Sequence, residues 1–209
     1  KDDHVNIIDQ TLLPHQLEIK SLKTLEDAVF AIKNMHVRGA PLIGVTAAYG
    51  MYLASKNDVT YEYLLNAAEI LKKARPTAIN LTWSVNKIIT TIRNIENNKR
   101  SKLILSLANR IREEDILACS KIGDNGLLLL EEIYNKKKST INILTHCNAG
   151  WLATVDWGTA LSPIFKANRK NIPIHVWVDE TRPRNQGFNL TAWELINEGI
   201  PNSLIVDNV

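Results

Sequence analysis

Cysteine is scarce in this 209-residue chain, in which Cys119 and Cys147 are the two that occur. They lie in dissimilar surroundings, and neither belongs to a Cys-x-x-Cys pair or to a cysteine and histidine spacing typical of zinc ligands. The cysteine content therefore argues against a disulfide framework and against a structural zinc site. We expect a protein of the reducing cytoplasm.

Long apolar runs are also missing. No segment approaches the roughly 18 consecutive apolar residues of a membrane-spanning helix, and the opening residues KDDHVNIIDQ lack the apolar core of a signal peptide. The formal net charge of +3 is modest, and the lysine cluster at 135–140 is interpreted as a solvated helix end and linker. We therefore expect neither a membrane nor a nucleic-acid partner.

The motifs that bind common nucleotides are absent as well. The chain contains no Gly-x-Gly-x-x-Gly and no Walker P-loop, so neither a dinucleotide nor a nucleoside triphosphate is implied. We expect no cofactor and no bound metal. What remains is an ordinary globular composition, 45% hydrophobic and 22% charged, with no internal repeat or low-complexity tract.

The first two thirds of the chain are predicted to be largely helical. Two short strand-like runs near 5–8 and 17–22 come first. Apolar residues then recur at helical spacing. The predicted helices cover 24–37, the small-residue segment after Pro41, 60–74, the segment from Ile79 and a long stretch up to about residue 138. We expect a mostly helical N-terminal domain with a short β start over 1–138.

From residue 139 onward the pattern changes to alternating strands and helices. Apolar β runs at 141–147, 172–180 and 203–207 are separated by helix-length segments at 149–169 and 190–199. This order predicts a parallel sheet with crossover helices. The predicted fold is α/β, a helical domain followed by a Rossmann-like domain over 139–209. Because the chain stops directly after the third strand, we expect that sheet to be incomplete.

Ionisable residues follow each predicted strand, at the edge where parallel sheets bind ligands. They are Cys147, then Asp179 with Glu180, and Asp207. For Cys147 two interpretations stay open at this stage, a reactive thiol and an inert thiol packed in a core. His146 is interpreted as structural, because neighbouring residues on a strand face opposite sides.

Three loops combine arginine with glycine, proline or threonine, at 37–41, 74–80 and 179–187. Guanidinium groups bind phosphate oxygens in bidentate fashion, and turns or helix starts add oriented backbone N–H groups. The loops therefore indicate phosphate binding. The alternative for each is solvation or an ion pair, and Arg182 could pair with Asp179 or Glu180.

Six ordered blocks carry a family resemblance over nearly the whole chain: VRGAPLIGVTAAYG, ARPTAINLTW, ILTHCNAGWLAT, VDETRPRNQG, LTAWEL and LIVDN. In them the chain resembles the methylthioribose-1-phosphate isomerase family, which is related to the regulatory subunits of translation initiation factor 2B. The resemblance implies isomerisation of 5-methylthioribose 1-phosphate to 5-methylthioribulose 1-phosphate in methionine salvage, without a cofactor and in a homodimer.

The resemblance also implies roles for individual residues. Cys147 and Asp207 correspond to the family's catalytic cysteine and aspartate. The substrate-binding positions, mostly around the phosphate, correspond to Arg38, Gly39, Ala40, Arg75 and Gln186. A thiol can act as acid or base at carbon, and a carboxyl group can shuttle the proton for ring opening. Whether hydrogen moves as proton or hydride stays open.

Some residues depart from the commoner family pattern. They are Trp151, Asp156 and Trp157, and Phe188 with Asn189. The catalytic pair is untouched, but the C5 substituent of the sugar is left open, so 5-deoxyribose 1-phosphate and ribose 1,5-bisphosphate are alternative substrates. Helix packing is preferred over substrate contact for the two tryptophans. A non-catalytic regulatory subunit of the initiation-factor type is the alternative from another class.

Overall fold

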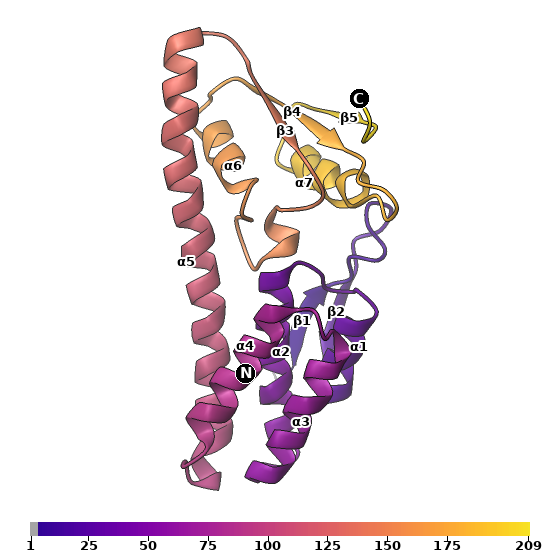
Figure 1. Cartoon of the computed structure of the whole chain (residues 1–209), viewed down its shortest axis with the longest axis vertical. Coiled ribbons are helices and arrows are strands. Elements are labelled where there is room, and N and C mark those ends of the chain that lie inside the picture. Colours follow the sequence, from indigo (N-terminus) through magenta and orange to yellow (C-terminus); the bar gives the residue numbers. More distant parts are fainter. Residues whose placement is uncertain (1–3) are drawn as a thin grey trace. The chain divides into compact units, whose positions relative to one another are not determined.

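The computed structural model describes residues 4–209, and these form two compact units. Unit 1 comprises residues 4–12 and Leu17–Glu114, and unit 2 comprises Leu13–Gln16 and Asp115–Val209. The helix α5, Asn97–Lys137, contributes its first part to unit 1 and the remainder to unit 2 (Figure 1). Within residues 4–209 no helix has the length and apolar character to cross a membrane.

Unit 1, drawn in indigo to magenta in Figure 1, begins with an antiparallel hairpin. Strands β1, Val5–Ile8, and β2, Ile19–Leu22, pair so that Val5 lies opposite Leu22, which confirms both predicted strands. Helix α1, Leu25–Lys33, follows from a capping box formed by Thr24 and Asp27. It ends before the predicted residue 37, because the backbone turns to a left-handed conformation at Met35 (φ 62°).

Three further helices complete the core of unit 1: α2, Ala40–Ser55; α3, Tyr61–Ala74; and α4, Ile79–Ile92. Helix α2 is rich in small residues and is buried around most of its circumference. Its Gly44 lies against the backbone of Asn80 and the side chain of Ser84, so an added Cβ would come within about 3 Å of α4. The N-terminal halves of α2 and α4 therefore lie close together.

Unit 2 contains the predicted parallel sheet, in the order β3-β4-β5. The strands are β3, Ile141–Thr145; β4, Ile174–Asp179; and β5, Asn202–Ile205. Helices α6, Ser162–Arg169, and α7, Ala192–Asn197, pack with the strands around one apolar cluster that includes Phe165, Val176 and Leu195 (Figure 1). The opposite face of the sheet exposes Leu144 and Trp177. The α/β fold class predicted from the sequence is confirmed.

The helix-length segment 149–169 is a correction to the sequence-based expectation. Helical structure is limited to a 3-10 turn, Trp151–Ala153, and to α6. Between them Trp157 (φ 69°) and Gly158 (φ 75°) adopt left-handed conformations, which an α-helix does not tolerate. The N–H of Val155 also leaves the helical pattern, donating to the Asp115 carboxylate at 3.0 Å.

The change from helices to strands falls where the sequence pattern places it, since α5 ends at Lys137 and β3 begins at Ile141. The predicted domain boundary at 138/139 stays a prediction, because the compact units described above divide the chain within α5. A π-helical turn, Gly187–Thr191, precedes α7. Its position at the end of β4 matters for the residues described next.

Candidate functional site

Cys147 lies two residues beyond the end of β3, half-buried and in a left-handed conformation (φ 60°). Non-glycine residues persist in that conformation when their surroundings hold them there. Two threonines do so here. The N–H of Cys147 donates to Oγ1 of Thr181 at 2.8 Å, and the Cys147 carbonyl accepts from Oγ1 of Thr191 at 2.7 Å. The backbone of Cys147 is thereby held at the carboxyl edge of the sheet.

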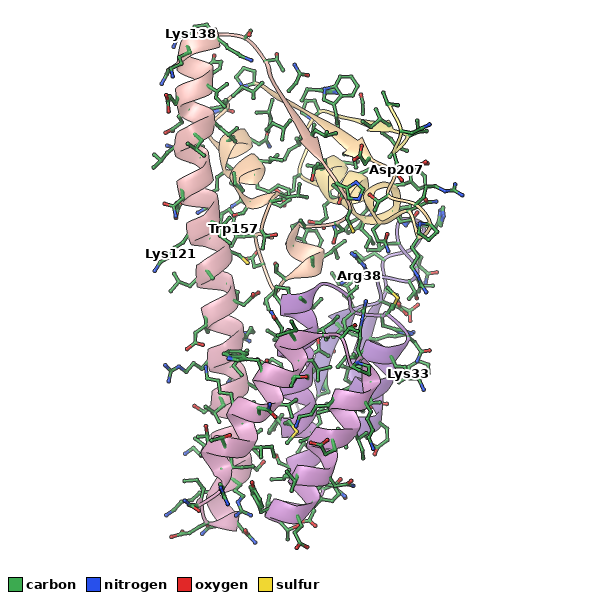
Figure 2. The ribbon with its side chains drawn as sticks, viewed as in Figure 1. Lys33, Arg38, Lys121, Lys138, Trp157 and Asp207 are labelled. Atoms are coloured by element: carbon green, nitrogen blue, oxygen red, sulfur yellow. The ribbon has the colours of Figure 1, made fainter. Side chains whose placement is uncertain are left out.

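Asp207 lies two residues beyond the end of β5, with an exposed side chain (Figure 2). Its two carboxylate oxygens accept from the N–H groups of Arg182 and Thr181, each at 2.7 Å. These hydrogen bonds to the charged form hold the pKa of the Asp207 carboxyl below its ordinary value. Asp207 is therefore a positioned carboxylate at neutral pH.

Thr181 joins these two residues. Its hydroxyl accepts from the N–H of Cys147, and its own N–H donates to Asp207. The same hydroxyl donates to the carbonyl of Asp179 at 3.1 Å, and Thr181 itself is buried with φ at 62°. The predicted catalytic cysteine and aspartate are thus connected through one residue, although they lie 60 positions apart in the chain.

Buried Glu194 holds the loop that follows Cys147. Its carboxylate accepts from Asn148 Nδ2 at 2.7 Å and from the N–H groups of Trp151 and Leu152 at 2.7 and 3.3 Å. Gly150 passes so close that an added Cβ would lie 1.9 Å from a Glu194 oxygen. Sequence reasoning missed this carboxylate, and its signal is a lone acidic residue in the apolar segment LTAWEL.

The sequence predicted Asp179 and Asp207 at the carboxyl edge of the sheet, but it did not predict that His146 lies with them. Nδ1 of His146 and Oδ2 of Asp179 are 2.9 Å apart, and ligand-type atoms of His146, Asp179 and Asp207 all lie within 4.8 Å of one another. This combination of atoms could hold a metal ion, although Nδ1 already contacts Asp179. The His146 side chain is 64% exposed, so the imidazole faces solvent at the edge that carries Asp207.

Cys119 lies in an environment that differs from that of Cys147. It lies in α5, is 2% exposed, and burial raises the pKa of its thiol to about 11, with the Asp115 charge contributing in the same direction. The two cysteines carry thiols that are not joined in a disulfide. Cys119 is therefore an inert thiol packed in a core.

Gln186 belongs to the same region of unit 2. It precedes the π-helical turn and is half-buried. The next residue, Gly187, packs directly on the end of β4, where an added Cβ would lie 1.6 Å from the carbonyl oxygen of Asp179. Gln186, Cys147 and Asp207 are therefore all placed around the carboxyl edge of the sheet.

Arg38, Gly39 and Ala40 form the entry to α2 in unit 1 (Figure 2). Gly39 is the residue before the helix and has φ at 84°, a conformation that suits glycine. No side chain caps the N-terminus of α2. The first N–H groups of α2 and the positive end of its dipole follow Arg38 directly in the chain. N–H groups of this kind and a guanidinium group both suit binding of a phosphate group.

Arg75 ends α3 shortly before the start of α4, which also lacks a side-chain cap. The Nη1 atom of Arg75 is buried, and among residues 4–209 it has no hydrogen-bond partner. Buried polar nitrogens normally have partners, and a water molecule or an anion can serve as the partner of such a nitrogen. Arg75 and the α2 entry lie in the same unit, where the N-terminal halves of α2 and α4 approach each other.

A buried charge network holds the segment before Arg38. Asp9 is 1% exposed and accepts from Lys20 Nζ at 2.5 Å, while His36 Nδ1 lies 3.1 Å away. Burial acts to raise the pKa of Asp9, but hydrogen bonds from Lys20 and Thr11 outweigh it and hold the pKa below its ordinary value. The network joins the β1–β2 hairpin to His36, two residues before Arg38.

Asp9→Asn is expected to lower the free energy of unfolding by about 2 kcal/mol at pH 7, because a charge-assisted network is lost. Since the folded pKa of Asp9 is lowered, its stabilisation is complete above the ordinary carboxyl pKa and disappears as the pH falls through the folded value. Urea unfolding at several pH values checks this. Glu69→Gln, which breaks a surface ion pair with Lys72, should change little. If Asp9→Asn were as stable as the wild type, the stabilising role of the Asp9 network would be contradicted.

The two departing tryptophans pack against helices. Trp151 contacts Trp193 edge to face, with ring centroids 5.7 Å apart, and lies against the apolar cluster of the sheet. Trp157 (Figure 2) is contacted by Lys166 and Arg169 of α6, both at 4.5 Å from the ring. These contacts agree with the packing interpretation.

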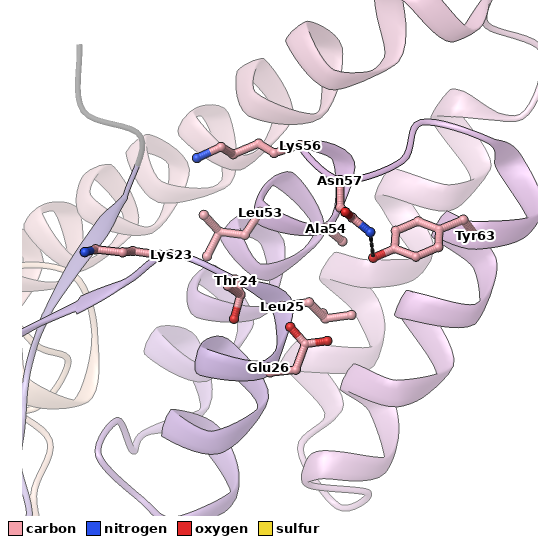
Figure 3. Close-up of a pocket in the computed structure, with 9 residues that line it drawn as sticks. All are labelled: Lys23, Thr24, Leu25, Glu26, Leu53, Ala54, Lys56, Asn57 and Tyr63. Atoms are coloured by element: carbon pink, nitrogen blue, oxygen red, sulfur yellow. Dashed lines mark hydrogen bonds between the residues drawn. The ribbon is translucent and has the colours of Figure 1, made fainter.

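One cavity of about 350 Å³ lies in unit 1 and is lined mainly by α1, α2 and the start of α3 (Figure 3). Its polar lining includes Lys23, Lys56 and Asn57, and Asn57 donates to the Tyr63 hydroxyl at 3.1 Å. None of the residues predicted to bind substrate or to catalyse lines this cavity. We therefore do not assign it to the candidate site.

Comparison with known proteins gives the following matches. The model of the initiation factor 2 subunit family matches residues 36–209. The methylthioribose-1-phosphate isomerase of Methylorubrum extorquens is 52% identical over 206 residues, 99% of this chain and 56% of that protein. The protein of the same name from Escherichia coli O45:K1 is 54% identical over 206 residues, 98% of this chain and 55% of that protein.

Two solved structures are similar over 100% of this chain. The 5-methylthioribose 1-phosphate isomerase of Pyrococcus horikoshii OT3 has a TM-score of 0.89 at 38% identity, with 59% of its own chain covered. Subunit delta of the translation initiation factor from A. fulgidus has a TM-score of 0.86 at 37% identity, with 61% covered. The resemblance stated from the sequence blocks is confirmed. The chain spans about half the length of the curated relatives it matches.

Proposed function

The chain belongs to the initiation factor 2 subunit family. We propose that it isomerises 5-methylthioribose 1-phosphate to 5-methylthioribulose 1-phosphate in methionine salvage. Curated relatives about half identical to it carry the name of that isomerase. The observation that carries the proposal is the connection of Cys147 to Asp207 through Thr181 at one sheet edge. A thiol and a carboxylate held in fixed positions are a plausible acid–base pair.

The reaction requires four changes in the substrate. The ring bond between C1 and the ring oxygen breaks, that oxygen takes up a proton, hydrogen moves from C2 to C1, and the C2 hydroxyl loses its proton to become a ketone. In the proposal Asp207 takes a proton from a hydroxyl, and Cys147 serves the hydrogen transfer between the carbons. The backbone hydrogen bonds to Cys147 and Asp207 set both groups before substrate arrives.

The phosphate is proposed to bind the groups described in unit 1. The entry to α2 supplies backbone N–H groups from the Gly39–Ala40 segment, and Arg38 and Arg75 supply guanidinium charge. Gln186 is proposed as a further polar contact to the sugar. We also propose a homodimer, a cytoplasmic location and no nucleic-acid partner, for which the family resemblance is the support; light scattering of the purified protein tests the dimer.

The experiment that tests the function is an isomerase assay of the purified full-length protein on three sugars in parallel. They are 5-methylthioribose 1-phosphate, 5-deoxyribose 1-phosphate and ribose 1,5-bisphosphate. We expect the highest kcat/KM with the first. A preference for either other sugar would change the substrate assignment and keep the enzyme class.

A regulatory subunit is the second candidate function, because subunit delta of the initiation factor shares the fold at a TM-score of 0.86. The curated relatives named as isomerases are more similar in sequence than that subunit, at 52–54% against 37% identity. The assay separates the two, since a regulatory subunit turns over none of the three sugars.

Arg75→Ala is expected to raise KM about 10- to 100-fold, equivalent to 1.4–2.7 kcal/mol, because a charge-assisted contact to phosphate is lost. Arg38→Ala should act in the same direction. The matched control is Arg93→Ala, an exposed arginine that follows α4. Steady-state kinetics with thermal melts check this. Unchanged KM with a lowered melting temperature would make Arg75 a structural residue instead.

A further inference from the structure

Glu194 carries a buried carboxylate to which the proposed reaction gives no role. It lies in α7 and is 0% exposed. A buried carboxylate is costly unless its oxygens accept hydrogen bonds, and here donors come from the loop that follows Cys147. They include the N–H groups of Trp151 and Leu152 and the side-chain amide of Asn148. The carboxylate is therefore placed where it can determine the path of that loop.

A chain of hydrogen bonds leads from Glu194 to Cys147. The Asn148 amide donates to Oε1 of Glu194 at 2.7 Å and to Oγ1 of Thr191 at 3.2 Å. The Thr191 hydroxyl in turn donates to the carbonyl of Cys147 at 2.7 Å. Glu194, Asn148 and Thr191 are all buried, so bulk water does not compete for these bonds. Glu194 is thus connected to the backbone that carries the thiol.

Gly150 brings the same loop into direct contact with Glu194. Its backbone is extended (φ −89°, ψ −164°), a conformation that any residue adopts. An added Cβ would nevertheless lie 1.9 Å from Oε2 of Glu194 and 2.6 Å from Oε1. Glycine is therefore needed at this position for space, and the loop and the carboxylate fit closely against each other.

The segment that carries Glu194 also borders the sheet edge at its other end. Gln186 precedes the π-helical turn Gly187–Thr191, and α7 follows that turn directly. Gly187 packs on the carbonyl oxygen of Asp179, and Glu194 lies one helical turn after Thr191. Turns of this kind are frequent at functional sites. One continuous segment therefore bears Gln186 and holds the Cys147 loop.

We infer that Glu194 is a positioning residue of the isomerase, which places the Cys147 thiol by holding the loop after it. The inference rests on the proposed function, in which Cys147 serves the hydrogen transfer between C2 and C1. Such a transfer depends on the placement of the reacting group, and a displacement of about 1 Å can lower the rate on the order of 100-fold. Glu194 itself contacts the loop and not the substrate.

Glu194→Gln in the full-length protein should lower kcat for 5-methylthioribose 1-phosphate about 10- to 100-fold and leave KM within about threefold. The amide keeps the size of the side chain, but its nitrogen cannot accept an N–H group, so the loop loses part of its support. KM changes little because Arg38 and Arg75, the groups proposed to bind phosphate, belong to unit 1. Steady-state kinetics are measured at a temperature at which thermal melts show each variant to be folded.

Glu198→Gln is the matched control. Glu198 follows the last residue of α7, is partly exposed and makes a 3.8 Å ion pair with Arg169. No hydrogen bond of the Cys147 loop described above involves its side chain. The same chemical change, four residues further along the chain, should leave kcat and KM unchanged.

Alkylation by iodoacetamide separates positioning from support of the fold. Cys147 is half-buried and Cys119 is buried, so the two thiols report on the site and on the core of the same protein. In Glu194→Gln, Cys147 should react at least about threefold faster than in the wild type, because its backbone is held less firmly. Cys119 should stay as unreactive as before. A residue that only stabilises the fold would leave the Cys147 rate unchanged or raise both rates together.

Gly150→Ala probes the same contact from the side of the loop. The added methyl group should displace the loop from the carboxylate and lower kcat about 10- to 100-fold. Glu194→Asp withdraws the carboxylate and makes room for that methyl group. The double variant should therefore keep at least about threefold more kcat than the product of the two single losses predicts. Losses that simply multiply would contradict a shared effect on Cys147.

The outcomes distinguish the inference from the proposed function. A wild type that turns over none of the three sugars would remove the proposed function and the inference with it. An active wild type, with folded Glu194→Gln within about threefold of its kcat or with an unchanged Cys147 alkylation rate, would overturn the inference alone. If Glu194→Gln does not fold, the Gly150→Ala and Glu194→Asp variants decide by the same criterion.

Discussion

Cys147→Ser is expected to lower kcat for 5-methylthioribose 1-phosphate about a thousandfold, while the sugar phosphate still binds. The hydroxyl of serine is a far weaker acid than a thiol, and it replaces the side chain without disturbing the hydrogen bonds that Thr181 and Thr191 make to the Cys147 backbone. Steady-state kinetics, with binding measured by calorimetry, check both parts of the prediction.

Cys119→Ser is the control for that substitution. Cys119 is buried in α5 with its thiol pKa raised to about 11, so it takes no part in the proposed chemistry. Its replacement should leave kcat unchanged in the folded protein, even if stability falls. Near wild-type turnover in Cys147→Ser would show that the thiol at the sheet edge is not the reacting group.

Asp207→Asn is expected to lower kcat by a similar factor, about a thousandfold, since the amide cannot accept the proton from the C2 hydroxyl. The side chain keeps its size, but its nitrogen cannot accept the N–H of Thr181 or Arg182 that a carboxylate oxygen accepts. The substitution therefore removes the base and loosens its position together.

The comparison variant for Asp207 is Asp124→Asn, which removes a surface ion pair with Lys166. Kinetics of both proteins, measured at the same pH, separate a specific effect from a general loss of negative charge. If Asp207→Asn kept kcat within a few-fold of the wild type, the carboxylate would be a structural anchor for the Thr181–Arg182 turn instead.

The sequence contained enough information to place the main elements. Alternating apolar runs and helix-length segments predicted three parallel strands, and the rule that ligands bind at their carboxyl ends selected Cys147, Asp179 and Asp207. The structure has these residues at that edge. The positions of the three strands along the chain follow from the local pattern, so they can be predicted before a structure is known.

The alternation argument used for His146 does not apply, for a physical reason. Side chains alternate between faces only while the backbone stays extended. The chain leaves β3 at Thr145, and Cys147 takes φ of 60°, so the alternation no longer decides where His146 points. Left-handed conformations at non-glycine residues have no reliable sequence signal, and they determine the geometry of this site.

Left-handed conformations also explain why the helix predicted at 149–169 does not form as one element, since Trp157 and Gly158 turn the chain there. The contacts of Thr181 and Glu194 could not be predicted from the sequence either. Each bonds to groups far along the chain, Thr181 to Cys147 and Asp207, and Glu194 to the loop after Cys147. Tertiary hydrogen bonds of this kind are set by the packed fold and leave no local pattern.

The most direct test of the central claim is the conversion of 5-methylthioribose 1-phosphate followed by NMR with the purified full-length protein. The wild type is compared with a Cys147→Ser, Asp207→Asn double variant under identical conditions. We predict that the ketose 5-methylthioribulose 1-phosphate accumulates with the wild type and at least about a thousandfold more slowly with the double variant. No ketose with the folded wild type, or equal rates for the two proteins, would contradict the assignment of Cys147 and Asp207 to an isomerase site.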